Sequence, residues 1–280
     1  MSSYTSRLSV KDALFEEPGP RAKVRIRIAT VISLILLAAL LVLVIRQFYI
    51  TGQLESRYWS FFLKYTTWRF LGMGLLGTVE AASLGGILAL LAGFVLMLGR
   101  LSKYKVFNAI SVAIIEFTRG VPTLLFIYFF FLVVPQFGIN MTALWKVVIP
   151  VALSACGIVA EVLRSGVNAV PKGQREAAIS LGLSEGSTFI KVILPQAIRY
   201  VIPALISELV IVVKDTTFAY VVSFPDLMQN AKVLISNYDA LLPVYLVVAV
   251  IYIIINYLLN KLSLFIAAKM NVKTVNVAEV

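Results

Sequence analysis

The sequence contains no histidine and a single cysteine, Cys156. An intramolecular disulfide is therefore excluded, and a zinc or haem site is not expected, because such sites depend mainly on His and Cys ligands. Catalysis by a histidine general base is also excluded. The chain lacks a G-x-x-x-x-G-K-[ST] motif, whose backbone amides and lysine hold nucleotide phosphates. We therefore expect no metal, no cofactor and no catalytic residues in this chain.

Charged residues are also scarce, at 14% of the chain, whereas hydrophobic residues make up 60%. A soluble domain would not bury that much apolar surface in one core. Apolar runs of about 18 residues or more recur, and a helix of about 20 residues crosses a hydrocarbon layer of about 30 Å. The net charge of +11 arises from Lys and Arg that flank these runs, which indicates membrane topology and not nucleic-acid binding.

The predicted fold class is therefore an all-α integral membrane protein with six transmembrane helices. Lys and Arg are concentrated in alternate connections, and the positive-inside rule places both termini and the connection 164–199 in the cytoplasm of a bacterial cell. The predicted parts are a polar tail (1–27), a first span (28–45), an external interfacial segment (46–69), a core with five spans (70–265) and a second tail (266–280).

The third span is interrupted. Two shorter apolar pieces, 106–117 and 123–134, meet at Arg119-Gly120-Val121-Pro122. Proline removes a backbone hydrogen bond and clashes with the preceding helical turn. The sequence therefore predicts a kinked or broken helix at this point.

The cytoplasmic connection predicts two short helices joined by a sharp turn. Residues 174–181 are rich in helix formers, and Gly182 can end that helix in a left-handed conformation. Ser184 can cap a second short helix, which Pro195 is expected to limit. An alternative is an ordinary amphipathic hairpin that lies on the membrane surface.

The spacing in this connection resembles the E-A-A-x3-G-x9-I-x-L-P signature of ABC importer permeases, with Val192 at the usual isoleucine. The resemblance implies that the connection docks into a groove of a separate ATPase and couples ATP hydrolysis to movement of the spans. ATP and Mg would then be bound by the ATPase. The residues expected to carry this coupling are Glu176, Ala177, Ala178, Gly182, Leu183, Ser184, Leu194 and Pro195.

The resemblance extends over most of 72–265. Residues 116–122 are similar to the family's E-L-F-R-G-T-P, and 160–166 to its A-E-I-x-R-G-G. The run 214–217 (Lys-Asp-Thr-Thr) is typical of the polar amino acid branch, and the whole is most similar to permeases of actinobacterial glutamate uptake systems. This implies an importer of glutamate or a related amino acid that works by alternating access. Its implied partners are an ATPase dimer, a second permease and an extracytoplasmic binding protein.

The sequence departs from that branch in three places. Ser207 and Glu208 replace a common Asn-Gln pair, and Gly157 replaces a common tyrosine. The first span is additional to the usual five. These departures leave the amino acid that is carried open, and much of that selection would lie in the binding protein.

Polar and ionisable side chains within spans are costly in a bilayer and usually face a bundle interior or a water-filled path. Ser154, Gly157, Glu161 and Arg164 share one helical face. The structural alternatives are a Glu161–Arg164 pair and a pair of Lys214 with Asp215 or Glu208. Glu80 has no assigned role. The candidate substrate pathway consists of Arg119, Ser154, Glu161, Ser207, Glu208, Lys214, Asp215 and Thr216.

Two other functions compete with an ABC permease. An ion-coupled secondary transporter would use coupling-ion sites at broken helices, for which the interruption at 120–122 is the only support. An integral membrane enzyme would need a nucleophile or base motif that the chain lacks.

Overall fold

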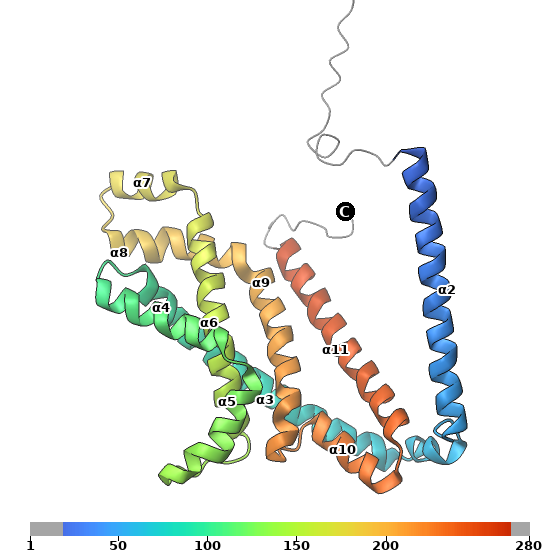
Figure 1. Ribbon diagram of the computed structural model, residues 1–280. Coiled ribbons are helices and arrows are strands. Elements are labelled where there is room, and N and C mark those ends of the chain that lie inside the picture. Colours follow the sequence, from blue (N-terminus) through green and yellow to red (C-terminus); the bar gives the residue numbers. More distant parts are fainter. Residues whose placement is uncertain (1–18, 270–280) are drawn as a thin grey trace, which may run out of the picture. The chain divides into compact units, whose positions relative to one another are not determined.

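The computed structural model describes residues 19–269, which are helical nearly throughout and contain no strand (Figure 1). The outer parts of both predicted tails, 1–18 and 270–280, lie outside the described residues. The chain divides into two compact units at Ser56. Within the first unit, helix α2 (Pro20–Ile50) begins with proline, whose fixed φ suits a first helical turn, and has no buried residue. It includes the predicted span 28–45 and continues beyond it at both ends.

The second unit holds the other long helices. Among residues 57–269, four helical runs are long and apolar enough to cross a membrane, in addition to α2. Short 3-10 turns η1 (Ser56–Tyr58) and η2 (Ser60–Leu63) precede the first of these runs. The runs are α3 (Tyr65–Leu101), α6 (Trp145–Ala169), the continuous stretch Glu185–Val222, and α11 (Leu241–Lys269).

The predicted interruption of the third span is a sharp break. Helix α4 (Lys105–Gly120) and the helical stretch Thr123–Phe137 are bent by 97° relative to each other. Val121 is extended because the ring of Pro122 disfavours a helical conformation at the preceding residue. The stretch consists of α5 (Thr123–Tyr128), the π-helix η3 (Phe129–Val133) and the 3-10 turn η4 (Val134–Phe137). With this bent pair counted as one span, the described residues contain the six predicted spans.

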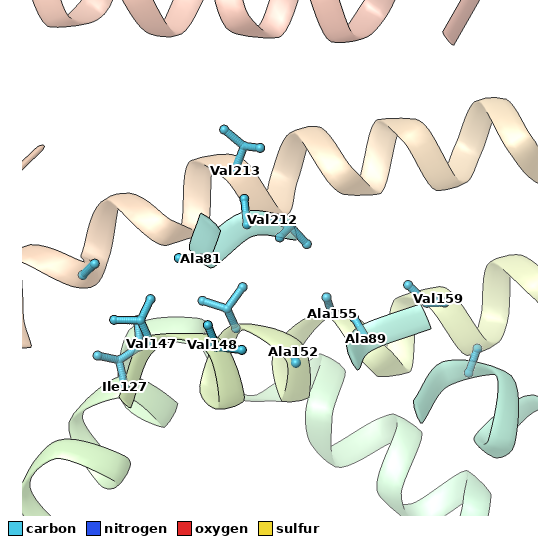
Figure 2. Packing of buried hydrophobic residues seen from close by; sticks show 14 of the residues in the cluster. Ala81, Ala89, Ile127, Val147, Val148, Ala152, Ala155, Val159, Val212 and Val213 are labelled. Carbon is cyan, nitrogen blue, oxygen red and sulfur yellow. The ribbon is translucent and has the colours of Figure 1, made fainter. Parts of the chain in front are cut away.

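The core of this unit lies where α3, α6 and α9 (Leu194–Asp215) meet. Figure 2 shows small and β-branched side chains from these helices facing one another, among them Ala89, Val159 and Val212. A Cβ added at Gly93 of α3 would lie 2.7 Å from a methyl carbon of Val159. Small residues thus allow close helix packing in a bilayer, where the hydrophobic effect contributes little to helix association.

The connection 164–199 forms the predicted turn. Helix α7 (Lys172–Ser180) ends before Gly182, which has φ +83°, and α8 (Glu185–Thr188) begins after Ser184, whose Oγ accepts a hydrogen bond from Ser187 N at 3.3 Å. Figure 1 shows α7 and α8 next to each other, at the end of α6. We call residues 172–188 the coupling loop below.

The prediction that Pro195 limits the second helix was wrong. The helix continues from α8 through the π-helix η5 (Phe189–Ile193), α9 and the 3-10 helix η6 (Thr216–Val222). In η5 the Leu194 amide donates to the Phe189 carbonyl, five residues earlier. This wider turn directly precedes the proline and accommodates its ring and its missing amide without ending the helix.

The N-terminal part of α3 is joined to helix α10 (Leu227–Tyr238) by buried polar contacts. Asn230 Nδ2 donates to the Phe70 carbonyl at 2.7 Å, and the Leu227 amide donates to Thr78 Oγ1 at 3.1 Å. Asp226 caps α10, because its Oδ1 accepts a hydrogen bond from the Gln229 amide at 2.7 Å.

Backbone approach at this contact is close. A Cβ at Gly77 would lie 2.4 Å from the Pro225 carbonyl oxygen, and one at Gly74 would lie 2.7 Å from that of Asp226. Asp226 is completely buried, and burial raises the pKa of its carboxyl from 3.8 to about 6. This end of α3 is therefore a tightly packed joint.

Candidate functional site: the coupling loop and the polar helix interior

The tip of the coupling loop exposes apolar side chains. Leu181, in the turn, is 84% exposed, and Ile179, in the last turn of α7, is 45% exposed. Ala178, in contrast, is buried, and its carbonyl accepts a hydrogen bond from the Leu183 amide across the turn. Exposed apolar groups on a rigid turn are typical of a surface that binds a partner.

Most of the predicted coupling residues shape or surround this tip. Gly182 and Ser184 form the turn and the cap, and Glu176 and Ala177 are exposed on α7. Leu194 and Pro195 lie farther along, where η5 passes into α9. The motif treats Ile179 and Leu181 as variable positions, so sequence reasoning missed them. Their apolar character in a polar connection was the available signal.

Charged side chains tie the loop to the rest of the unit. Glu185, the first residue of α8, forms ion pairs with Lys103 in the α3–α4 connection and with Arg175 of α7, the latter at 3.2 Å. All three side chains are more than half exposed, so each pair contributes little stability alone. Together the pairs fix α8 relative to two other elements.

A second charged group lies deeper, on α6. Glu161 pairs with Arg164 at 2.7 Å, as one structural alternative predicted, and also with Arg100 of α3 at 3.1 Å. A cavity of about 600 Å³ beside this group is lined by Glu161, Arg164 and Arg119. Arg119 itself pairs with Glu116 at 3.6 Å. Sequence reasoning did not identify Arg100 as a member, because it was counted among the basic residues that follow its span and indicate topology.

A polar contact joins three helices in the interior. Thr123 Oγ1, at the start of α5, lies 2.7 Å from Ser154 Oγ of α6 and donates to Asp215 Oδ2 of α9 at 2.7 Å. We call Thr123, Ser154 and Asp215 the polar node. Ser154 and Asp215 were predicted pathway residues, whereas Thr123 was missed. Its position directly after the helix break was the signal that could have identified it.

The other predicted pathway residues are distributed differently. Within residues 19–269, Lys214 forms no ion pair and is exposed, so the alternative pairing with Asp215 or Glu208 does not occur. Glu208 is only 5% exposed and lines a separate cavity of about 370 Å³. Ser207 is exposed, and Thr216 is buried and donates to the Val213 carbonyl. Glu80 is exposed on α3.

Gly157, where tyrosine is common in similar permeases, has a packing role in this structure. A Cβ there would lie 2.3 Å from Thr118 Oγ1 and 2.9 Å from the Ile115 carbonyl oxygen. The missing side chain lets α4 approach α6 just before the break. It thereby helps to place the start of α5 beside Ser154.

Most of the second unit matches a known protein family. Residues 85–272 match the family described as "binding-protein-dependent transport system inner membrane component". This range contains the coupling loop, the charged group on α6 and the polar node.

Individual proteins are similar over most of the chain. The glutamate transport system permease protein GluD of Corynebacterium glutamicum is 35% identical over 216 residues, which cover 76% of this chain and 79% of that protein. The arginine transport system permease protein ArtQ of Bacillus subtilis is 29% identical over 188 residues, 66% of this chain and 86% of that protein.

Solved structures agree with these matches. A crystal structure of an amino acid ABC transporter with histidines superposes with a TM-score of 0.69 and 30% identity, covering 74% of this chain and 96% of that one. An inward-facing MetNI methionine ABC transporter matches with a TM-score of 0.64 at 17% identity, over 74% of this chain and 99% of that one. The second match shows the shared fold.

Proposed function

Since the chain belongs to the family of binding-protein-dependent transport system inner membrane components, we propose that it is the membrane-spanning subunit of an ATP-driven importer for a polar amino acid. The similar permeases are named for glutamate and for arginine transport. Glutamate or a related amino acid is the proposed substrate, because the protein named for glutamate transport is 35% identical over 76% of the chain.

The exposed, apolar tip of the coupling loop carries this proposal. Leu181 lies in a turn that Gly182 and Ser184 shape, and 84% of it is exposed. We propose that it enters a groove of a separate ATPase, which binds ATP and Mg. Movement of the ATPase would then reach the spans through the continuous helix Glu185–Val222.

The polar interior of the unit supports a transport path. In this proposal the chain pairs with a second permease, identical or homologous, and an extracytoplasmic binding protein delivers the amino acid. The cavity beside Arg119 and Arg164 carries excess positive charge, which suits a substrate carboxylate. ATP binding and hydrolysis by the partner bias the path between outward and inward states through differential binding.

We propose that the chain spans the inner membrane of a bacterial cell, with both termini and the coupling loop on the cytoplasmic side. A cysteine introduced as Glu176→Cys, in a Cys156→Ala background, tests it with a membrane-impermeant thiol reagent. Labelling is expected only when the inner face is accessible. Labelling of intact cells from outside would contradict the orientation and with it the docking of an ATPase.

Reconstitution tests the function directly. The chain, its partner permease and the ATPase are placed in liposomes, and uptake of radiolabelled glutamate, aspartate, glutamine and arginine is measured with the binding protein outside. Uptake is expected to require both ATP inside and the binding protein. Uptake by the chain alone, driven by an ion gradient, would instead favour the secondary transporter, which the family match disfavours.

Two substitutions test the path. Thr123→Val removes the hydroxyl that bonds the half-buried Asp215 and Ser154, so the polar contact between α5, α6 and α9 is lost and slower uptake is expected. Lys214→Met tests whether this unpaired cation contacts substrate. Unchanged uptake and unchanged substrate preference would remove Lys214 from the path.

A further inference from the structure

The base of the coupling loop contains a cavity that the transport function does not require. Its volume is about 530 Å³, and it is bounded by the ends of α3 and α6 together with α7, α8 and η5. Apolar side chains from the ends of the spans and from η5 form one wall, among them Leu98, Leu101, Val170 and Phe189. This wall lies where two membrane-spanning helices terminate.

The rest of the cavity is positively charged. Lys103, Lys172 and Arg175 line it, with Glu185 as the acidic residue among its lining residues. Glu185 is already paired with Lys103 and Arg175, and within residues 19–269 Lys172 has no ion pair. Because three cations face one carboxylate, the cavity has an excess of two positive charges and free hydrogen-bond donors.

A buried hydroxyl in the wall also lacks a partner. Thr188 is 1% exposed, and in the described part of the chain its Oγ1 accepts and donates no hydrogen bond. Thr188 lies directly before the π-helix η5, a departure from α-helical geometry that is frequent at functional sites. An unsatisfied buried hydroxyl costs free energy, which a ligand oxygen would recover.

We propose that this cavity binds the phosphate headgroup of an anionic phospholipid. The phosphate would lie between Lys172, Arg175 and the Thr188 hydroxyl, and the glycerol and upper acyl chain would lie along Leu98 and Leu101. Basic pockets between membrane-spanning helices are suited to such headgroups. The apolar wall favours a lipid over free phosphate, because a free anion gains nothing from contact with leucine side chains.

The lipid would connect the ends of two spans with both helices of the coupling loop. It would thereby strengthen the attachment of a loop whose exposed ion pairs with Glu185 contribute little. The inference does not depend on transport, since it needs only that α3 and α6 end at a membrane surface. A failed uptake experiment and a failed lipid experiment are therefore distinguishable.

Lipid binding is tested on the full chain purified with its ATPase, by native mass spectrometry during titration with short-chain phosphatidylglycerol. Short-chain phosphatidylcholine and inorganic phosphate are titrated in parallel. We expect selective binding of phosphatidylglycerol. The double variant K172Q/R175Q is expected to weaken it at least tenfold, since two charge-assisted contacts are lost. Thr188→Val, which keeps the side-chain shape, is expected to weaken it about fivefold.

The matched control is K105Q/K191Q, which removes two lysines of the same connections that do not line the cavity. Its binding of phosphatidylglycerol is expected to equal that of the unmodified chain. If both double variants weakened the binding of phosphatidylglycerol equally, the effect would arise from general surface charge, and the proposed site would be wrong. Equal binding of phosphatidylcholine, or displacement of the lipid by millimolar phosphate, would overturn the assignment to an anionic lipid. Loss of the ATPase from K172Q/R175Q with unchanged lipid binding would assign the cavity to the protein interface instead.

Discussion

The two ends of α3 are built differently. At the end near Phe70, glycines of α3 touch the backbone just before α10, and buried hydrogen bonds made by Thr78 and Asn230 join the two helices. At the end near Leu101, the neighbouring coupling loop is held by exposed ion pairs and carries apolar side chains on its outside. The first end pairs its buried groups within the chain, except for Oδ2 of Asp226, whereas the second end exposes groups that other molecules can contact.

Glycine and polar residues occur at both ends of α3, but they serve different purposes at the two ends. At the α10 end, Gly74 and Gly77 are needed because the packing leaves no room for a larger side chain. Glycine and polar residues in the coupling loop instead shape a surface. Substitutions should therefore affect stability at the first end and coupling at the second.

The largest effect is expected for Leu181→Asp, which should reduce ATP-driven uptake by more than tenfold and release the ATPase during purification. The charge cannot enter an apolar groove without a large desolvation cost, and the side chain contributes little to the fold of the chain because it is 84% exposed. The control is Leu63→Asp, a leucine that is 90% exposed at the other end of α3. An intact complex containing Leu181→Asp would contradict the docking role of the tip.

Asp226→Asn should stabilise the protein above pH 6. Because burial raises the pKa of this carboxyl from 3.8 in an ordinary environment to about 6, the folded protein binds its proton more tightly than the unfolded chain does. Stability therefore falls as the pH rises between these values and stays lower above them. At about 1.4 kcal/mol per pH unit, the difference amounts to about 3 kcal/mol. Asparagine retains the capping oxygen and has no such penalty.

The measurement is the apparent melting temperature of the detergent-solubilised protein at pH 4 and at pH 8. The variant should melt higher than the unmodified protein at pH 8, and the gain should vanish at pH 4. Asp239→Asn, which removes an exposed carboxylate at the other end of α10, serves as the control. An equal gain at both pH values would show that the Asp226 carboxyl is not the titrating group.

Gly77→Ala should destabilise the protein by about 1–3 kcal/mol through overpacking. The new Cβ would meet the Pro225 carbonyl oxygen at 2.4 Å, a backbone atom that cannot turn aside. Gly72→Ala is matched, since it lies on the same helix with no atom within 4 Å of its Cβ, and it should stabilise α3 slightly. Similar melting temperatures for both variants would argue against the tight joint.

The smallest effect is expected at the turn of the coupling loop. Gly182→Val places a β-branched residue at φ +83°, at a cost of about 1–2 kcal/mol, although its Cβ has free space. Gly182→Asn should be tolerated, because asparagine adopts this conformation more readily. We expect several-fold less uptake per ATP hydrolysed for the valine variant only. Equal activity of both would show that coupling does not depend on the shape of this turn.

The sequence was informative where structure depends on neighbouring residues. The bend at Pro122 and the turn at Gly182 follow from backbone rules that act over a few positions, and both are present. The same rules failed at Pro195. The π-helix η5 before it makes room for the proline ring and its missing amide, so the helix does not end there. Backbone rules for proline and glycine therefore predict a helix end only where the neighbouring turn is itself a regular α-helix.

Contacts between distant residues were beyond such rules. Thr123 and Asp215 lie 92 positions apart, and the hydrogen bond between them depends on how α5 and α9 are rotated about their axes. The same is true of Arg100 and Glu161, which join α3 to α6. Helical periodicity indicated that Ser154 and Glu161 share a face, but not which helices that face meets.

The continuous helical run from Glu185 to Val222 connects the coupling loop directly to the interior of the second unit. It carries an ion-paired residue of the coupling loop at one end and Asp215 of the polar node near the other. Within this run, α9 (Leu194–Asp215) is about 32 Å long at about 1.5 Å per residue, so a tilt of about 7° about its first residue moves Asp215 by about 4 Å. A displacement of that size exceeds the length of a hydrogen bond. Small rocking of the loop is thus sufficient to make or break the Thr123–Asp215 contact, with no rearrangement of any element in between.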